Sequence, residues 1–384
     1  MKKACAFLLL TALCTSLCSC WDYGNITEIN IVSGVAVDVS DTPGNYIFTF
    51  EIANVAAGPE ELAASIYAET EAPTFFEAVC RSKSKLASKF YLGNMQVMII
   101  SREIAENEGL FSFLDALLRG GEPRETISLL VSSEPTASEI LRAHGLDIKN
   151  LSQELRKILE DDAKLTSGTK STQLHQAYNA VTGEGAALVL PAVCFGEGSD
   201  PEEKVVTVNG VALLPHGRLA GFLTPGETRM FLAATDGLRG GSFSFEPSAG
   251  GAYSASMEIK KSGTEILLDC RGGFLKITLD IKADMAAAEL SVPAGVPQSE
   301  VISRLEEQSA GELRRRVLGI VRRAQAEYGA DIFSFGNLLY RENPGLWAQV
   351  RDDWDEMFRG AEIEVRAAVS ITSIGIISAE RGRE

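Results

Sequence analysis

The chain has 384 residues, of which 45% are hydrophobic and 23% are charged, with 35 glycines and 13 prolines. This composition is typical of globular proteins and excludes the collagen-like, disordered and multi-span membrane classes. The length predicts two or three domains, each with a core of its own. A formal net charge of −16 repels polyanions, so it excludes nucleic-acid binding through a basic surface and disfavours adsorption to anionic lipid by a basic face.

The N-terminus has the pattern of an export signal. The basic pair Lys2-Lys3 precedes an apolar run over residues 4–17, which is too short for a spanning helix and ends in small residues. The tetrad Leu17-Cys18-Ser19-Cys20 resembles the bacterial lipobox, in which a diacylglycerol is attached to the last cysteine before cleavage. We therefore expect a lipoprotein signal peptide over residues 1–19 and a diacylglycerol cysteine at Cys20, with acyl chains such as palmitate holding the protein on the bilayer. An ordinary exported protein cleaved nearby is the alternative.

The seven cysteines do not predict a disulfide framework. Three of them leave with the leader and Cys20 is expected to be acylated, so Cys80, Cys194 and Cys270 remain, an odd number. Each of these three lies among apolar neighbours. We therefore expect them to be small buried hydrophobes rather than metal ligands or nucleophiles.

Residues 20–196 predict a mixed α/β N-terminal domain. The elements expected in chain order are strands over 29–38 and 46–55, a helix from Thr74 toward Ser88, a strand over 95–100, a helix over 110–118, a strand over 126–131, a helix from Pro135 that ends before Gly145, and helices over 151–162 and 173–181. Alternation of strands and helices predicts a mixed sheet with helices packed on it.

The acidic, glycine-containing stretch 196–203 has no periodic apolar residues and is the expected domain boundary. Residues 204–380 then predict a C-terminal α+β region, an antiparallel sheet that carries long helices on one face. Its expected elements are strands over 205–214 and 219–223, a capping box at Thr224 and Glu227, strands over 257–260, 265–270 and 274–283, a helix over 298–328, a helix after Pro344, and a closing strand over 362–371. The whole chain is therefore expected to be of the α+β class.

Searches for motifs that carry chemistry find none that is complete. The sequence has no Walker loop, HExxH, CxxC, GxSxG or calcium-loop pattern. Gly183-Glu184-Gly185 lacks the third glycine of a dinucleotide fingerprint and precedes a strand rather than a helix. The sequence therefore assigns no catalytic, cofactor-binding or metal-binding residue, and we expect neither a cofactor nor enzymatic activity.

Histidines and carboxylate clusters are the remaining candidates for a polar site. His144, His175 and His216 lie in separate expected elements, so surface roles are favoured over catalysis. The clusters at 160–162 and 352–356 could hold a metal or act as acid and base. We interpret both clusters as solvated helix faces, because apolar residues on the other side of each helix point inward.

Three segments resemble the Ger(x)C family of spore germination lipoproteins: Cys20-Trp21-Asp22, residues 92–131 and residues 330–375. The most specific part is an ordered set of landmark residues, Asp331-Ile332-Phe333, Phe335-Gly336, Trp347, Trp354 and Asp355, followed by the alternating final strand. Independently of the family, the four aromatic side chains of Phe333, Phe335, Trp347 and Trp354 are expected in a core.

The sequence departs from the family pattern at two places. Ser334 stands where the resemblance leads us to expect glycine, and Gly120-Gly121-Glu122-Pro123 is less charged than the family's pattern there. The resemblance implies three small domains with an unusual topology, which would divide the C-terminal region again near Gly250.

The resemblance also implies a function. It implies the C subunit of a nutrient germinant receptor, a non-enzymatic lipoprotein on the outer face of the inner spore membrane. Its partners there would be a multi-span A subunit and a transporter-like B subunit. A solute-binding lipoprotein of a transporter is the alternative, although that class needs two similar lobes around a cleft. An envelope hydrolase ranks third, because the motif search finds no catalytic pattern.

Overall fold

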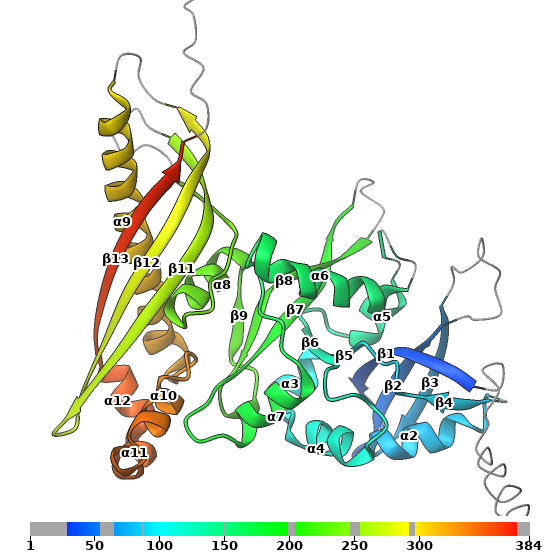
Figure 1. The fold of residues 1–384 in the computed structure, drawn as a ribbon. Helices are drawn as coiled ribbons and strands as arrows, with labels where there is room; N and C mark the ends of the chain where they lie inside the picture. Colours follow the sequence, from blue (N-terminus) through cyan, green and yellow to red (C-terminus); the bar gives the residue numbers. More distant parts are fainter. Residues whose placement is uncertain are drawn as a thin grey trace, which may run out of the picture.

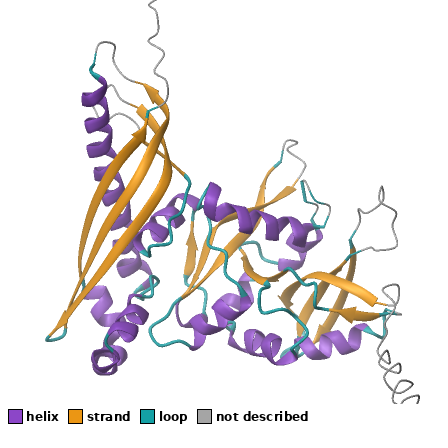
Figure 2. Ribbon diagram, viewed as in Figure 1, coloured by secondary structure: helices purple, strands orange, loops and turns teal. Residues whose placement is uncertain are grey.

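The computed structural model describes residues 29–374, except 54–64, 87, 144, 147, 149, 199–203, 246–253 and 292–295. The described strands form two sheets, one of nine strands and one of four (Figure 1). Helices pack on both sheets, which confirms the α+β class (Figure 2). The leader and Cys20 lie outside the described residues. No described helix combines the length and hydropathy of a membrane span.

The first sheet is mixed, with the strand order β3-β2-β1-β5-β6-β7-β8-β9, and β4 also pairs with β1. Its strands are β1 (Ile29–Val39), β2 (Tyr46–Ile52), β3 (Ile66–Ala72), β4 (Lys89–Tyr91), β5 (Val97–Ile100), β6 (Ser128–Ser132), β7 (Leu188–Glu197), β8 (Lys204–Leu214) and β9 (Gly221–Leu223). Pairs from β1 through β5 and β6 to β7 are parallel, and the remaining pairs on the path are antiparallel. The central strands β5 and β6 are buried along their whole length, because helices cover both faces of the sheet.

Two groups of helices cover these two faces. One face carries α2 (Phe75–Ser82), α3 (Arg102–Asn107), α4 (Phe111–Gly120) and α7 (Leu174–Thr182). The other face carries α5 (Ala137–Arg142) and α6 (Leu151–Leu165). Thr74 caps α2 as expected, but α2 ends at Ser82, short of the expected Ser88, and the sequence did not predict the short helix α3.

The expected boundary at 196–203 does not separate two sheets. Strands β7 and β8, on either side of it, pair antiparallel along most of their length. The stretch therefore joins neighbouring strands of one sheet. A linker between domains and a loop between two paired strands can both be polar and contain glycine, so composition does not distinguish a linker from such a loop. The chain passes to the second sheet later, between α8 (Pro225–Ala234) and β10 (Ser242–Phe245).

The second sheet has the order β10-β11-β12-β13. Strands β11 (Ser254–Arg271) and β12 (Phe274–Ser291) form an antiparallel pair of 18-residue strands, so the two strands expected over 257–260 and 265–270 are one. Strand β13 (Glu362–Ser373) pairs with β12 in the parallel sense, which corrects the expected antiparallel order. The reason is the intervening helix α9 (Gln298–Arg323), which returns the chain to the starting end of β12.

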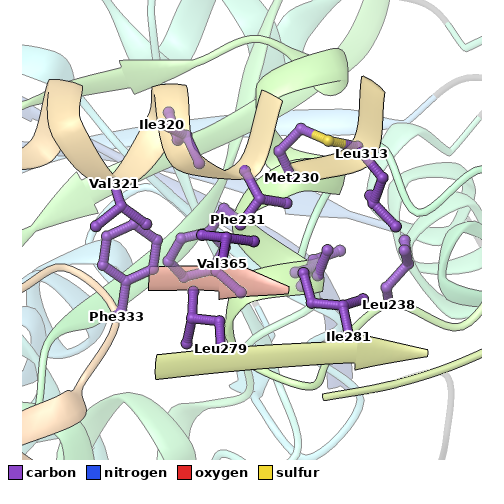
Figure 3. Packing of buried hydrophobic residues seen from close by; sticks show 14 of the residues in the cluster. Met230, Phe231, Leu238, Leu279, Ile281, Leu313, Ile320, Val321, Phe333 and Val365 are labelled. Carbon is purple, nitrogen blue, oxygen red and sulfur yellow. The ribbon is translucent and has the colours of Figure 1, made fainter. Parts of the chain in front are cut away.

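Helix α9 packs on the apolar face of the second sheet. It continues into a π-helical turn, η3 (Ala324–Tyr328), so the helix expected over 298–328 is confirmed. Figure 3 shows Leu313 and Val321 of α9 above Leu279 and Ile281 of β12. The same cluster includes Phe231 of α8 and residues of β7 and β8, so the core of the second sheet continues into the edge of the first.

A group of short helices replaces the single helix expected after Pro344. These are α11 (Pro344–Val350), the 3₁₀ turn η4 (Arg351–Asp353) and α12 (Trp354–Gly360), and they follow α10 (Phe335–Glu342), which the sequence did not predict. The rings of Trp347 in α11 and Trp354 in α12 meet edge to face, 5.4 Å between centroids. The turn η4 between α11 and α12 allows the two indole rings to contact each other.

The cysteines are less buried than expected. Cys80 is exposed, and Cys194 and Cys270 are half-buried. The expectation of three buried thiols is therefore wrong. Apolar neighbours in sequence do not imply burial, since consecutive residues of a strand or helix point in different directions.

A buried carboxylate fixes α6 to the first sheet. Glu51 in β2 is 0% exposed, and its carboxylate oxygens accept hydrogen bonds from the backbone N–H groups of Leu151 and Ser152, each at 3.1 Å. The hydroxyl groups of Ser65 and Ser152 donate to the same carboxylate. These contacts place a negative charge at the N-terminus of α6, where the helix dipole favours it.

Asp38 in β1 holds α5 in the same way. Its carboxylate accepts from the backbone N–H groups of Ala137 at 2.6 Å and Ser138 at 2.9 Å. Burial raises the pKa of Asp38, although these hydrogen bonds act in the opposite direction. Strand carboxylates therefore set the position of both helices on this face.

Replacing Glu51 by alanine should lower the free energy of unfolding by about 3 kcal/mol, because two helix N–H groups and the buried hydroxyls lose their acceptor. The control Glu160→Ala removes an exposed ion pair with Arg156 on the same helix and should cost less than about 0.5 kcal/mol. Urea unfolding of both variants measures the difference. Equal small losses would show that the carboxylate does not fix α6.

Candidate functional site

The landmark residues between Asp331 and Asp355 lie where the short helices of the C-terminal region meet two loops of the first sheet. One loop, residues 183–187, connects α7 to β7. The other is η2 (Pro215–Gly217), the turn between β8 and β9. We call this contact region the junction. It is the candidate functional site.

Asp331 is the centre of the junction. The residue is 6% exposed, and its carboxylate accepts hydrogen bonds from the backbone N–H groups of Phe333 at 2.9 Å and Gly336 at 2.7 Å. The indole N–H of Trp354 donates to it at 3.1 Å. Burial raises the pKa of Asp331 to about 6, with the nearby Asp355 acting in the same direction. The carboxylate thus joins the start of α10 to the start of α12.

The aromatic landmarks pack around this carboxylate. Phe333 and Phe335 stack with ring centroids 5.1 Å apart, and both are nearly fully buried, as are Trp347 and Trp354. The expectation that these four side chains form part of a core is confirmed. Gly336 leaves room for both indoles, since a Cβ atom there would lie 2.8 Å from Trp354 Nε1 and 3.0 Å from the Trp347 ring.

Ser334 has the backbone geometry of a glycine. Its backbone φ is +62°, in the left-handed region that residues other than glycine rarely adopt. This geometry explains why glycine is expected at this position. The Ser334 hydroxyl accepts a hydrogen bond from the backbone N–H of Ala187 at 2.9 Å. The serine therefore gains a contact with the first sheet that glycine would not make.

The loop 183–187 receives the C-terminal helices. The indole N–H of Trp347 donates to Glu184 Oε2 at 2.9 Å, and the Asn337 side-chain amide donates to the Glu184 backbone carbonyl at 2.9 Å. The Asn337 backbone N–H donates to the Gly185 carbonyl at 2.8 Å. Gly185 has a φ of +62°, and a Cβ atom there would lie 2.5 Å from Gly336.

Sequence reasoning missed the role of this loop. In the sequence, Gly183-Glu184-Gly185 is an incomplete dinucleotide motif and predicts no site. The pattern did carry one usable signal, because glycines between a helix and a strand indicate a tight turn with positive φ. Nothing in the pattern indicates the tryptophan that Glu184 binds from 163 residues away.

The two histidines that the structure describes do not come together. His216 Nε2 lies 2.8 Å from Asp355 Oδ2 across the junction, with its side chain 74% exposed. His175 is half-buried on α7, with Nδ1 3.2 Å from the Glu125 carbonyl. His144 lies outside the described residues. The two described histidines therefore make separate local contacts.

A cleft of about 640 Å³ borders the junction, between the loop 183–187, the turn η2 and residues 351–359. Asp352, Asp353 and Glu356 are exposed at this cleft, as a solvated helix face should be. The described residues that line it include no serine, threonine or cysteine that could act as a nucleophile. Across the described part of the chain, no group of three His, Cys, Asp or Glu side chains is placed to hold a metal ion.

The first carboxylate cluster has a structural member. Glu160 and Asp161 are exposed, but Asp162 accepts hydrogen bonds from the backbone N–H groups of Gly168 at 3.2 Å and Thr169 at 3.0 Å. Asp162 therefore holds the loop that follows α6, and its neighbours form the expected solvated face.

The raised pKa of Asp331 predicts a pH dependence of stability. The folded protein holds this proton more tightly than the unfolded chain, whose pKa is near 3.8. The resulting stabilisation is fully present below about pH 3.8 and is lost as the pH rises through about 6. Relative to Asp331→Asn, the free energy of unfolding of the wild type should fall by about 3 kcal/mol between about pH 4 and about pH 7. Urea unfolding at a series of pH values measures this difference, and an opposite slope would contradict it.

Comparisons with known proteins agree with this architecture. The family model described as "Spore germination protein N-terminal domain" matches residues 22–193, and the model described as "Spore germination B3/ GerAC like, C-terminal" matches residues 209–375. The chain is 22% identical to spore germination protein KC of Bacillus subtilis, over 98% of this chain and 97% of that protein. It is also 22% identical to spore germination protein B3 of the same organism, over 98% of this chain and 100% of that protein.

A solved structure has the same fold. The crystal structure of the GerBC protein superposes with a TM-score of 0.57 at 18% identity, covering 88% of this chain and 97% of that one. The two family models together span both sheets and the junction between them. The chain therefore belongs to the Ger(x)C family of spore germination proteins.

Proposed function

We propose that the chain is the lipid-anchored C subunit of a germinant receptor, needed for nutrient-triggered germination, and that its role is assembly rather than catalysis. The observation that carries this proposal is that the landmark residues make structural contacts inside the protein. Asp331 and Trp354 are buried in contacts that hold the C-terminal helices to one another, and Trp347 holds them to the loop 183–187 of the first sheet. Groups that carry out chemistry must reach a substrate, whereas these three side chains are enclosed in the protein.

Membrane attachment in this proposal comes from Cys20. The basic pair, the short apolar run and the tetrad that ends at Cys20 support cleavage before this residue and its acylation. Two or more acyl chains give stable anchoring, because each buried methylene contributes about 0.8 kcal/mol. The protein would then lie on the outer face of the inner spore membrane, beside the membrane-spanning A and B subunits.

A solute-binding lipoprotein is less well supported. That class needs two similar lobes around the ligand. Here the cleft at the junction lies beside a mixed sheet of nine strands and a group of short helices that belongs to a four-stranded sheet. The two sides of the cleft therefore differ in architecture, and the assembly role remains the better proposal.

The lipid anchor can be tested at Cys20. Radiolabelled palmitate should label the chain in growing cells, and Cys20→Ala should abolish the label because no acceptor thiol remains at the cleavage site. Cys80→Ala is the matched control, since this thiol is exposed on the folded protein and its loss should leave the label unchanged. Mass spectrometry that finds an unmodified Cys20 in membrane-bound protein would contradict the proposal.

The assembly role can be separated from chemistry at the cleft. Gly336→Ala should cost about 2 kcal/mol or more, because the new methyl group overlaps two buried indoles. We expect less of the chain in spore membranes and an equal fall in the germination response. Gly319→Ala, at an open position of α9, should leave both unchanged or stabilise the helix by roughly 0.5 kcal/mol.

The corresponding cleft variant combines Asp352→Asn, Asp353→Asn and Glu356→Gln. It should leave the amount of the chain and the germination response close to wild type, since these side chains are exposed. Quantitative immunoblots and the loss of optical density of nutrient-treated spores measure the two quantities. A normal amount of protein with no germination response would favour catalysis or solute binding at the cleft.

A further inference from the structure

One segment of this acidic protein is locally basic. Residues 78–101 contain Arg81, Lys83, Lys85 and Lys89 and no aspartate or glutamate, in a chain whose net charge is −16. The whole-chain charge, which disfavours adsorption to anionic lipid by a basic face, averages over this segment. The position of residues 78–101 in the fold decides whether these four side chains can contact the same partner.

These cations lie on α2, on the turn that follows it and on β4. Lys83, Lys85 and Lys89 are exposed, and so is Arg81. Two large apolar side chains of the same two elements are also exposed, Phe76 of α2 at 73% and Tyr91 of β4 at 41%. We call this set of six residues the α2 surface.

Two of the four cations also cover the free edge of the first sheet. Arg81 donates to the backbone carbonyl of Glu71 at 2.9 Å, and Lys85 donates to that of Glu69 at 2.7 Å, both on the edge strand β3. The backbone carbonyl groups that accept these hydrogen bonds carry no net charge, so they do not neutralise Arg81 and Lys85. Glu77 forms an ion pair with Arg81, and the Glu71 carboxylate also attracts this guanidinium. Lys83, Lys85 and Lys89 form no ion pair within the part of the chain that the structure describes.

The α2 surface lies where the N-terminal segment enters the fold. Strand β4 pairs with the first residues of β1, and the register places Lys89 directly opposite Ile29. The Asn30 side-chain amide donates to the Ser88 carbonyl at 3.0 Å. Cys20 is nine residues upstream of Ile29. Even a fully extended segment of this length reaches only about 30 Å, so a lipid on Cys20 keeps this surface near the bilayer.

We propose that the α2 surface rests on an anionic lipid bilayer and thereby fixes how the protein stands on the membrane. This inference depends on the proposed lipid anchor at Cys20. Positive charges next to two exposed aromatic side chains fit a headgroup layer, where lysines meet lipid phosphates and aromatic rings lie at the interface.

Because of the lipid anchor, weak contacts between the α2 surface and the lipid headgroups are sufficient to orient the protein. Each lysine near an anionic surface raises the equilibrium constant for contact by about fivefold. Because the anchor already holds the chain at the membrane, contact is an intramolecular step and needs no further affinity from solution. The opposite face of the first sheet, covered by α5 and α6, would then point away from the lipid.

The exposed thiol of Cys80 offers a native position for a probe, one helical turn from Phe76 on α2. The mature lipoprotein, with Cys194→Ala and Cys270→Ala, is labelled there with a fluorophore. It is reconstituted into phosphatidylcholine vesicles that contain about one-third phosphatidylglycerol and a nitroxide-labelled phospholipid as quencher. A matched protein carries the probe at Lys157→Cys on α6, with Cys80→Ala.

We expect quenching of the probe at Cys80 and much weaker quenching at position 157. Quenching at Cys80 should disappear in vesicles of phosphatidylcholine alone and in about 1 M salt, where the screening length falls to about 3 Å. Lys83→Glu with Lys89→Glu should lower the ratio of quenched to unquenched probe by about twentyfold or more. The control pair Lys157→Glu and Lys164→Glu makes the same charge change on α6 and should leave this ratio unchanged.

Vesicle flotation separates the two proposals. If the chain floats with the vesicles and the probe at Cys80 is quenched no more than the probe at 157, the α2 surface does not face lipid and this inference is wrong, while the anchor stands. If the chain does not float, the anchor proposal fails and this inference fails with it.

Discussion

The contact on which the arrangement of the two sheets depends is the buried carboxylate of Asp331. It accepts hydrogen bonds from two backbone N–H groups and from the indole of Trp354, so it fixes the start of α10 and the position of α12 together. With these elements fixed, Trp347 and Asn337 reach the loop at Glu184. Buried donors are costly without an acceptor, which makes this one side chain a requirement for the whole junction.

The same use of carboxylates recurs in the first sheet. Glu51 and Asp38 accept the free N–H groups at the N-termini of α6 and α5. Acidic residues in this chain therefore have two distinct roles. Most are solvated, while a few are buried and determine where helices begin. The formal net charge counts both groups alike, and it also hides the locally basic α2 surface.

Several elements could be predicted because their signals are local. The alternation of Leu275, Ile277, Leu279 and Ile281 predicts a strand with one buried face, and the apolar stripe of α9 predicts a helix that covers it. The capping box at Thr224 and Glu227 marks the start of α8, and both of its hydrogen bonds form. The pairing of β7 with β8 and the parallel sense of β13 were not predictable, because hydrogen bonds between strands leave no trace in the order of residues.

The sequence by itself determined the fold class, the family and most of the core, including the four aromatic landmarks, since hydrophobic periodicity and the order of large side chains are properties of the chain. It also singled out Ser334, whose positive φ accounts for the glycine expected there. Only the tertiary structure decided what these residues do. Glu184 meets Trp347 across 163 residues, and Lys89 lies opposite Ile29. Such contacts depend on how the sheets pack and register, and a linear pattern carries no information on distance in space.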